Sequence, residues 1–276
     1  MWFRKNVLLK NYTTFKIGGP AKYFYTAKTK ENLITAIKKA KELKLSFFIL
    51  GGGSNLLVSD KGFRSLVVKF GQPLSQYVPR GLEWAIGIPG TVQGAVRGNA
   101  GAFRKSMKDV IETVEVFDAK TEKIKIFKNK DCKFGYKDSI FKHKKNLIIL
   151  SVSLYCFKKE NKKIIEKKIK KYLEQRKKTQ PLNFPSAGSV FKNPKGFSAG
   201  ELIEKCGLKG KKIGKVKISE KHSNFIVNLG NGKAEDVMKL IKLAKKEVKN
   251  KFKVNLEKEI EFLSFPPLTN FLKMKK

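Results

Sequence analysis

The 276-residue chain has few of the residues that build disulfide scaffolds and metal sites. Its three cysteines, Cys132, Cys156 and Cys206, are far apart and form no CxxC pair, and its two histidines are His143 and His222. Disulfide frameworks and zinc ribbons need closely spaced cysteines, and a histidine-based metal site needs more than two distant histidines. The sequence therefore predicts free thiols in a reducing compartment and no bound metal.

Long apolar runs are also missing. No stretch approaches the ~20 continuous apolar residues that span a bilayer. Near the N-terminus the apolar run is limited to Val7–Leu9, which is too short for the core of a secretory signal peptide. We therefore expect a cytoplasmic protein without a membrane span.

Acidic residues are scarce, with 23 Asp and Glu against 61 Lys and Arg, so the formal net charge is +38. Such a charge is typical of nucleic-acid-binding proteins, which are the alternative from a different functional class. The lysines, however, are spread along the whole chain, and arginine, which forks to phosphates and bases, is much rarer. We expect no nucleic-acid partner, although the positive field would favour an anionic small substrate.

The hydrophobic pattern predicts three successive parts that mix strands and helices. The first, residues 1–70, has strands at 22–27, 47–50 and 66–69 and a helix at 31–43. The second, residues 71–180, has a hairpin of 110–117 with 123–127, a strand at 147–157 and a helix at 162–178. The third, residues 181–264, has strands at 215–218, 225–228 and 257–263, a helix capped by Ser198, and a helix at 236–249. A loose basic tail, residues 265–276, follows.

A first glycine-rich loop, Gly51–Asn55, lies between a predicted strand and the apolar Leu56–Val58. Three consecutive glycines permit positive φ and let a ligand approach the backbone closely. Their N–H groups can form a nest for a phosphate or pyrophosphate, and Ser54 and Asn55 can add side-chain hydrogen bonds. The loop is neither GxGxxG nor a P-loop, and a tight turn between two strands explains it equally well.

A second loop, Ile86–Ala95, is again rich in glycine and other small residues and continues to Asn99–Ala102. Small residues let the backbone lie flat against a large rigid ligand, so the two loops together could clamp both ends of a dinucleotide. The alternative is a turn that enters a helix, with close helix packing at Gly94 and Gly98.

A series of motifs resembles the UDP-N-acetylenolpyruvoylglucosamine reductase family, in the family's order, from about Asn11 to Leu263. They are Asn11–Ala21, Gly51–Val58, Gly87–Ala102, Tyr136–Phe141, Ser186–Pro194, His222–Asn228 and Glu257–Leu263. The resemblance implies an α+β fold of the FAD-binding PCMH type, similar to vanillyl-alcohol oxidase. In that fold two α/β sub-domains, residues 1–70 and 71–180, hold non-covalent FAD. A C-terminal α/β domain, residues 181–264, binds the UDP-sugar, and its closing strand returns Glu259 to the active site.

The resemblance also implies the reaction. NADPH reduces FAD, which then reduces the enolpyruvyl group of UDP-N-acetylglucosamine enolpyruvate to UDP-N-acetylmuramate for peptidoglycan synthesis. Ser189 matches the proton donor, and Glu259 matches a glutamate that polarises the enol carboxylate while protonated, a role that requires burial. Without the resemblance, Gly188-Ser189 would be interpreted as a turn and Glu259 as part of a charged edge strand.

The remaining site residues follow from the same resemblance. The residues predicted to bind the cofactor are Gly51, Gly52, Gly53, Ser54, Asn55, Pro89, Gly90, Thr91, Gly94 and Ala95. The residues predicted to bind the substrate are Tyr136, Lys192 and Asn193. Strand alternation leaves open whether the Lys192 side chain points toward Ser189. His222 is assigned a structural role, and the protein is expected to be a monomer.

Three features bear on how this chain differs within the family. Lys137 stands where the family has arginine, so the charge is kept but the bidentate fork is lost; we expect Lys137 to act as the catalytic cation. Residues 69–81 replace a longer stretch of the second FAD sub-domain, which puts cofactor affinity more than the fold in question. Arg176 and Gln180-Pro181 resemble the shorter subtype, which lacks a tyrosine loop over the substrate.

Two rival flavoprotein interpretations stay open at this point. Another FAD-dependent oxidoreductase of the superfamily would share the glycine loops but would lack Ser186–Pro194 and Glu259. A degenerate family member would bind nucleotide without turnover, a possibility raised by Lys137 and by the short 69–81 segment.

Overall fold

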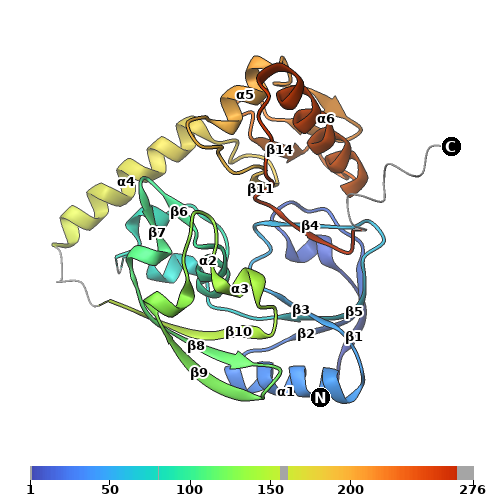
Figure 1. Ribbon diagram of the computed structural model, residues 1–276, viewed down its shortest axis with the longest axis vertical. Helices are drawn as coiled ribbons and strands as arrows, with labels where there is room; N and C mark the ends of the chain where they lie inside the picture. Colours follow the sequence, from blue (N-terminus) through green and yellow to red (C-terminus); the bar gives the residue numbers. More distant parts are fainter. Residues whose placement is uncertain (1, 80, 156–160, 266–276) are drawn as a thin grey trace. The chain divides into compact units, whose positions relative to one another are not determined.

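The computed structural model describes residues 2–79, 81–155 and 161–265, and the chain divides into two compact units (Figure 1). Unit 1 consists of Met1–Phe3, Phe24–Gly52 and Leu66–Leu182, and unit 2 of Arg4–Tyr23, Gly53–Ser65 and Asn183–Lys276. The predictions for Cys156 and for the tail from residue 266 onward lie outside the described residues. The three-part division expected from the sequence stays a prediction.

The first part of unit 1 is a small α/β arrangement, as its sequence pattern predicts. Helix α1 (Lys30–Glu42) begins where the Thr29 side chain accepts a hydrogen bond from Asn32 N, and it buries Leu33, Ala36, Ile37 and Ala40 at helical spacing. Strand β3 (Phe47–Leu50) pairs parallel with residues 66–69 of β5 (Phe63–Lys69). Two further strands earlier in the chain are β1 (Arg4–Leu8), which belongs to unit 2, and β2 (Pro20–Thr26).

The rest of unit 1 is built on a three-stranded antiparallel sheet of order β10-β8-β9, drawn in green in Figure 1. The hairpin of β8 (Ile111–Asp118) with β9 (Lys123–Lys128) confirms the prediction, and β10 is Leu147–Leu154. Helices α2 (Val92–Gly98), α3 (Ile140–His143) and α4 (Lys162–Thr179) and strands β6 (Gly101–Ala102) and β7 (Lys105–Ser106) complete it. One apolar cluster, with Trp84, Val96, Met107, Ile111 and Phe141 fully buried, forms the core.

Unit 2 contains an antiparallel sheet of order β11-β14-β13-β12. Its strands are β11 (Ser186–Ser189), β12 (Lys212–Ile213), β13 (Val216–Ile218) and β14 (Phe225–Asn228). Helices α5 (Ala199–Lys205) and α6 (Ala234–Phe252) pack on the same core; Ser198 Oγ accepts from Glu201 N at the start of α5. The Asp60 carboxylate accepts from Ala234 N and Glu235 N, which stabilises the start of α6.

Short single-turn 3-10 helices fill several connections. They are η1 (Leu9–Tyr12), η2 (Leu74–Tyr77), η3 (Glu83–Ala85), η4 (Met107–Asp109) and η5 (Asn129–Cys132). None of the helices in the described part of the chain is both long enough and apolar enough to cross a bilayer.

The strand predicted at 257–263 is wrong in extent. Only β15, Glu261–Leu263, is a strand, and it pairs parallel with β4 (Leu56–Val58). The preceding residues run beside a different segment, with a single bridge between Phe191 and Lys258. Glu259 N donates to Val190 O, whereas Glu261 N donates to Asn55 O, so the chain changes partners within three residues. The sequence pattern of one continuous strand thus pairs with two different segments, one at Val190 and one at Asn55.

Candidate active site

The two glycine loops meet within unit 1. A Cβ placed on Gly52 would lie 2.4 Å from Gly90 Cα, and one on Gly51 would lie 2.6 Å from Thr91 Oγ1. Any L side chain at Gly52 would collide with backbone, so glycine is required for this close approach. The structure thereby brings together two loops that the sequence could place only on separate segments.

The short segment that follows β5 holds the second loop in place. Val92 N donates to Gln72 O at 2.9 Å, and Leu74 N donates to Gly90 O at 3.0 Å. Gln72 N also donates to Gln93 Oε1 at 3.0 Å, and Gln93 Nε2 donates to Leu150 O at 3.2 Å. Residues 71–74 therefore support the loop, while the shortening of residues 69–81 and its effect on FAD affinity stay predictions.

The far end of the second loop enters α2. Thr91 Oγ1 accepts from Gly94 N at 3.2 Å, and Thr91 O accepts from Ala95 N at 2.9 Å, so both amides are already bonded. Gly94 and Ala95 would therefore contribute to ligand binding because their small size leaves room for a ligand, and not through their amides. Close helix packing does not explain Gly98, because a Cβ there would meet nothing within 4 Å.

The first loop continues into unit 2, where it connects to the C-terminal segment. Gly53 has φ +62°, and its carbonyl accepts from Thr14 N at 3.2 Å. Asn55 Nδ2 donates to Glu259 O at 3.2 Å, and Asn55 O accepts from Glu261 N at 3.0 Å. Ser54 between them is partly exposed. The candidate cofactor loop and the segment that carries Glu259 are thus directly hydrogen-bonded.

Ser189 and Glu259 lie on neighbouring backbone segments of unit 2. Ser189 ends β11 opposite Phe225, after a register shift at Gly188, whose φ is +76°. The next residue, Val190, accepts from Glu259 N at 2.8 Å through its carbonyl. Both side chains are partly exposed, so Glu259 lacks the burial that its expected role while protonated requires. The structure therefore brings the backbone segments of these two residues together, and their roles in proton donation and carboxylate polarisation stay predictions.

Asn224 fixes the backbone segment that follows Ser189, a role that sequence reasoning missed. Its side chain accepts from Phe191 N at 2.9 Å and donates to Phe191 O at 2.8 Å, while only 3% of its surface is exposed. A buried amide that satisfies both backbone groups of one residue fixes the position of that residue. The only sequence signal was its place inside the motif His222–Asn228.

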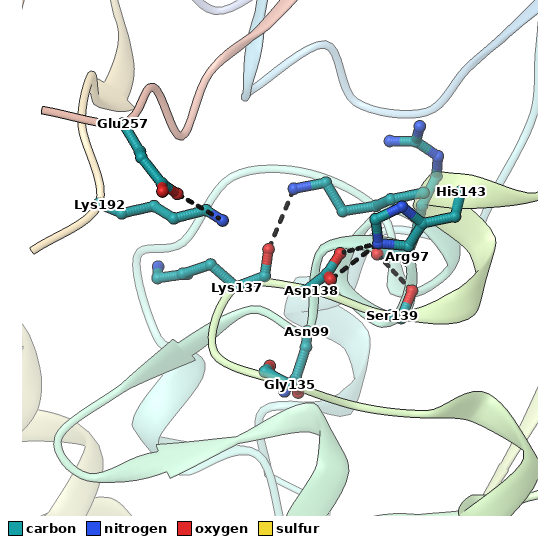
Figure 2. A network of polar contacts seen from close by, with 10 residues as sticks. Arg97, Asn99, Gly135, Lys137, Asp138, Ser139, His143, Lys192 and Glu257 are labelled. Atoms are coloured by element: carbon teal, nitrogen blue, oxygen red, sulfur yellow. Dashed lines mark hydrogen bonds and ion pairs between the residues drawn. The ribbon is translucent and has the colours of Figure 1, made fainter. Parts of the chain in front are cut away.

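Lys192 and Asn193 follow directly along the same segment. Lys192 Nζ lies 3.5 Å from Glu257 Oε2 (Figure 2), which gives the direction that strand alternation had left open. Asn193 Oδ1 accepts from Ala199 N at 3.0 Å, so this candidate substrate residue also stabilises the loop before α5.

Lys137 lies in unit 1, on a tight turn between Gly135 and Asp138 whose backbones bond reciprocally at 3.0 and 3.2 Å (Figure 2). Lys137 has φ +55°, an uncommon conformation for a residue other than glycine. Lys142 Nζ donates to Lys137 O at 3.0 Å, and the Asp138 carboxylate pairs with His143 Nε2 at 2.8 Å. Burial tends to raise the pKa of Asp138, but its hydrogen bonds to His143 and Ser139 and the nearby positive charges outweigh this and lower it.

The same turn is tied to the end of α2. Asn99 Nδ2 donates to Gly135 O at 2.7 Å, and Ser139 Oγ donates to Arg97 O at 2.6 Å (Figure 2). These bonds hold Tyr136 and Lys137 out at the turn, where the Tyr136 side chain is exposed. Ser189 and Glu259, by contrast, belong to unit 2.

Arg176 is the main residue that sequence reasoning undervalued, because it served there only as a marker of subtype. Its side chain is 6% exposed, and its guanidinium lies 5.3 Å from the centre of the Phe103 ring. Nη1 donates to Gln180 Oε1 at 3.3 Å, whereas Nε and Nη2 are buried without a hydrogen-bond partner among the described residues. Burial lowers the pKa of this guanidinium. An uncompensated buried cation is costly, so the site calls for an acceptor-rich anionic ligand.

These features test whether unit 1 fits FAD. Gly51 and Gly52 lie directly against Gly90 and Thr91. Because the glycines have no side chains, the backbone of the two loops stays accessible to a ligand. Buried donors without an acceptor, which include Trp84 Nε1 as well as Arg176, suit the negative charge and many acceptor atoms of a flavin nucleotide. The residues therefore fit the cofactor. They indicate a cofactor-dependent enzyme of the α+β class.

Comparison with known proteins identifies the family. The chain belongs to the UDP-N-acetylenolpyruvoylglucosamine reductase family, whose C-terminal domain matches residues 180–263. The reductase of Caldanaerobacter subterraneus subsp. tengcongensis is 43% identical, over 94% of this chain and 92% of that protein. The reductase of Caldicellulosiruptor bescii is 41% identical, over 95% and 90%. The crystal structure of the Thermus caldophilus reductase MurB matches with a TM-score of 0.80 and 36% identity, over 95% of this chain and 99% of that one. The predicted family and α+β flavin-binding fold are confirmed.

Gly52→Ala is expected to weaken FAD binding. The new Cβ would meet Gly90 Cα at 2.4 Å, and this backbone cannot rotate away as a flexible side chain could. Overpacking of this kind costs about 1–3 kcal/mol, or roughly 5- to 150-fold in Kd if the cost falls on the bound state. Titration of the apoprotein with FAD, followed by flavin fluorescence, measures the effect. Gly98→Ala is the matched control, because its Cβ meets nothing within 4 Å; equal losses in both variants would contradict the assignment.

Proposed function

We propose that this protein reduces the enolpyruvyl group of UDP-N-acetylglucosamine enolpyruvate to give UDP-N-acetylmuramate for peptidoglycan precursor synthesis, with NADPH as the reductant. Membership of the reductase family supports the reaction. The observation that carries the proposal is the backbone hydrogen bond from Glu259 N to Val190 O, which joins the segment that carries Glu259 to the residue after Ser189.

FAD, bound without a covalent link, would supply the hydride relay from NADPH to the enolpyruvyl methylene carbon. Two kinds of residue would hold the cofactor: residues of the two glycine loops, and one buried arginine with donors that lack an acceptor among the described residues. They are Gly51, Gly52, Gly53, Ser54, Asn55, Pro89, Gly90, Thr91, Gly94, Ala95 and Arg176. Their placement in tight backbone contact, and the buried guanidinium, support this assignment.

The chain's own residues would then complete the reduction. Hydride addition leaves negative charge on the carboxylate side of the substrate, which a protonated Glu259 and the Lys137 cation would stabilise. Ser189 Oγ would donate the proton to the adjacent carbon. A hydroxyl is a weak acid, so this step needs a strongly basic carbanion as the acceptor. Tyr136, Lys192 and Asn193 would hold the sugar nucleotide.

The setting of the reaction is also a proposal. NADPH and UDP-sugars carry several negative charges, which suits a cytoplasmic enzyme with a net charge of +38 that steers anions to its site. We propose that it acts as a monomer and has no nucleic-acid partner.

The visible spectrum tests the proposed function. Purified protein, reconstituted with FAD if needed, should show oxidised flavin that NADPH bleaches and the enolpyruvyl substrate restores. A protein that takes up no flavin would refute the proposal. Flavin that is bleached by NADPH but not reoxidised by substrate would instead identify a degenerate family member.

A further inference from the structure

The Lys192–Glu257 ion pair is built into the segment that carries the candidate catalytic residues. Lys192 N donates to Glu257 O at 2.8 Å, directly beside the bridge between Phe191 and Lys258. This backbone bond holds the two residues opposite one another, and their side chains meet at 3.5 Å (Figure 2). Lys192 lies three residues after Ser189, and Glu257 lies two before Glu259. The pair is therefore fixed by a backbone bond next to the one that joins Val190 to Glu259.

A carboxylate at this place opposes the charge of the rest of the protein. The chain has 23 acidic residues against 61 basic ones, yet Glu257, Glu259 and Glu261 alternate within a single short stretch. The Lys192 side chain is 26% exposed and that of Glu257 is 76% exposed. An ion pair whose carboxylate is 76% exposed adds little to stability, so stability alone does not account for Glu257. Glu257 instead reduces the positive charge that Lys192 presents to a ligand.

We propose that Glu257 is a positioning residue that restrains Lys192 and sets the affinity of the site for its anionic substrate. This inference rests on the proposed function, because it takes the substrate to be a UDP-sugar. In the free protein the carboxylate neutralises Lys192. A diphosphate carries enough charge to draw the ammonium away, whereas a single phosphate competes less well. Glu257 thereby makes the site selective for diphosphates and keeps phosphate from occupying it.

Glu257→Gln tests the proposal in the FAD-loaded protein. The Kd for UDP, measured by calorimetric titration at low ionic strength, should fall about three- to tenfold, and inhibition by inorganic phosphate should strengthen by a larger factor than UDP binding does. The KM for the enolpyruvyl substrate should fall with the Kd, while kcat does not rise. Raising the salt concentration should shrink the difference, because an exposed pair is screened.

Two further variants show whether the effect passes through Lys192. Lys192→Met should weaken UDP binding, and adding Glu257→Gln to it should change the Kd by less than twofold. Glu220→Gln is the matched control: it removes the partner of Lys217, a pair at 2.9 Å with side-chain exposures of 25% and 70%. That control should leave the Kd for UDP unchanged.

The outcomes separate this inference from the proposed reaction. An unchanged Kd in Glu257→Gln, or an equal fall in the Lys192→Met background, would overturn the role of Glu257 while wild-type turnover upholds the reaction. Absent turnover, together with UDP binding that still depends on Glu257, would refute the reaction and uphold the ion pair. Failure of the wild-type protein to bind UDP would refute both.

Discussion

Ser189→Ala is expected to keep the reduction of bound flavin by NADPH and to lose turnover of the enolpyruvyl substrate by about 10²- to 10⁴-fold, the range for loss of a general acid. The two half-reactions separate because only the second needs a proton delivered to carbon. The substitution removes one hydroxyl from a partly exposed position at the end of β11. The fold should therefore survive it.

Stopped-flow absorbance can follow each half-reaction alone. The rate of flavin bleaching by NADPH should match the wild-type rate, and the rate of reoxidation by substrate should fall. Ser186→Ala is the matched control, because it changes a serine in the same strand whose hydroxyl accepts a long 3.5 Å bond from Gly188 N. Normal reoxidation in Ser189→Ala, or an equal loss in Ser186→Ala, would show that another group donates the proton.

Local periodicity explains which elements were predictable from the sequence. Helix α6 was visible because Val237, Leu240, Ile241, Ala244 and Val248 recur at helical spacing and are all buried. The hairpin of β8 and β9 was visible for a similar reason, since its pairing is local along the chain. The extent of β15 was not, because the break at Glu259–Glu261 depends on Val190 and Asn55, which are distant in sequence.

In the candidate site, too, the features set by neighbouring residues were predictable and those set by distant residues were not. Glycine triplets indicated close backbone approach, but the partner of Gly52 is Gly90 on another loop, and only the fold shows that contact. Arg176 is the clearest case, since a basic residue in a lysine-rich amphipathic helix looks like ordinary surface charge. Its burial depends on Gly87 and Phe103, which pack against it from elsewhere in unit 1.

Arg176→Met is expected to change stability and cofactor affinity in opposite directions. Replacing a buried charge that lacks a full set of partners by an apolar side chain of similar length is often stabilising by about 1–4 kcal/mol. The apoprotein should therefore unfold at higher denaturant concentration. If the guanidinium binds FAD, loss of a charge-assisted hydrogen bond worth about 1.5–3 kcal/mol should raise the Kd for FAD roughly 10- to 150-fold.

Denaturant unfolding of the apoprotein and fluorescence titration with FAD measure the two effects separately. Lys178→Met, an exposed basic residue on the same helix, is the control and should change neither. Arg176→Lys keeps the charge but loses the planar fork, so its Kd for FAD should lie between those of the wild-type protein and Arg176→Met. A less stable apoprotein with unchanged FAD affinity would show that Arg176 supports the packing of Phe103 and Gly87 rather than a ligand. A more stable apoprotein that binds FAD poorly would mean that the chain keeps an unfavourable buried charge because the cofactor compensates it.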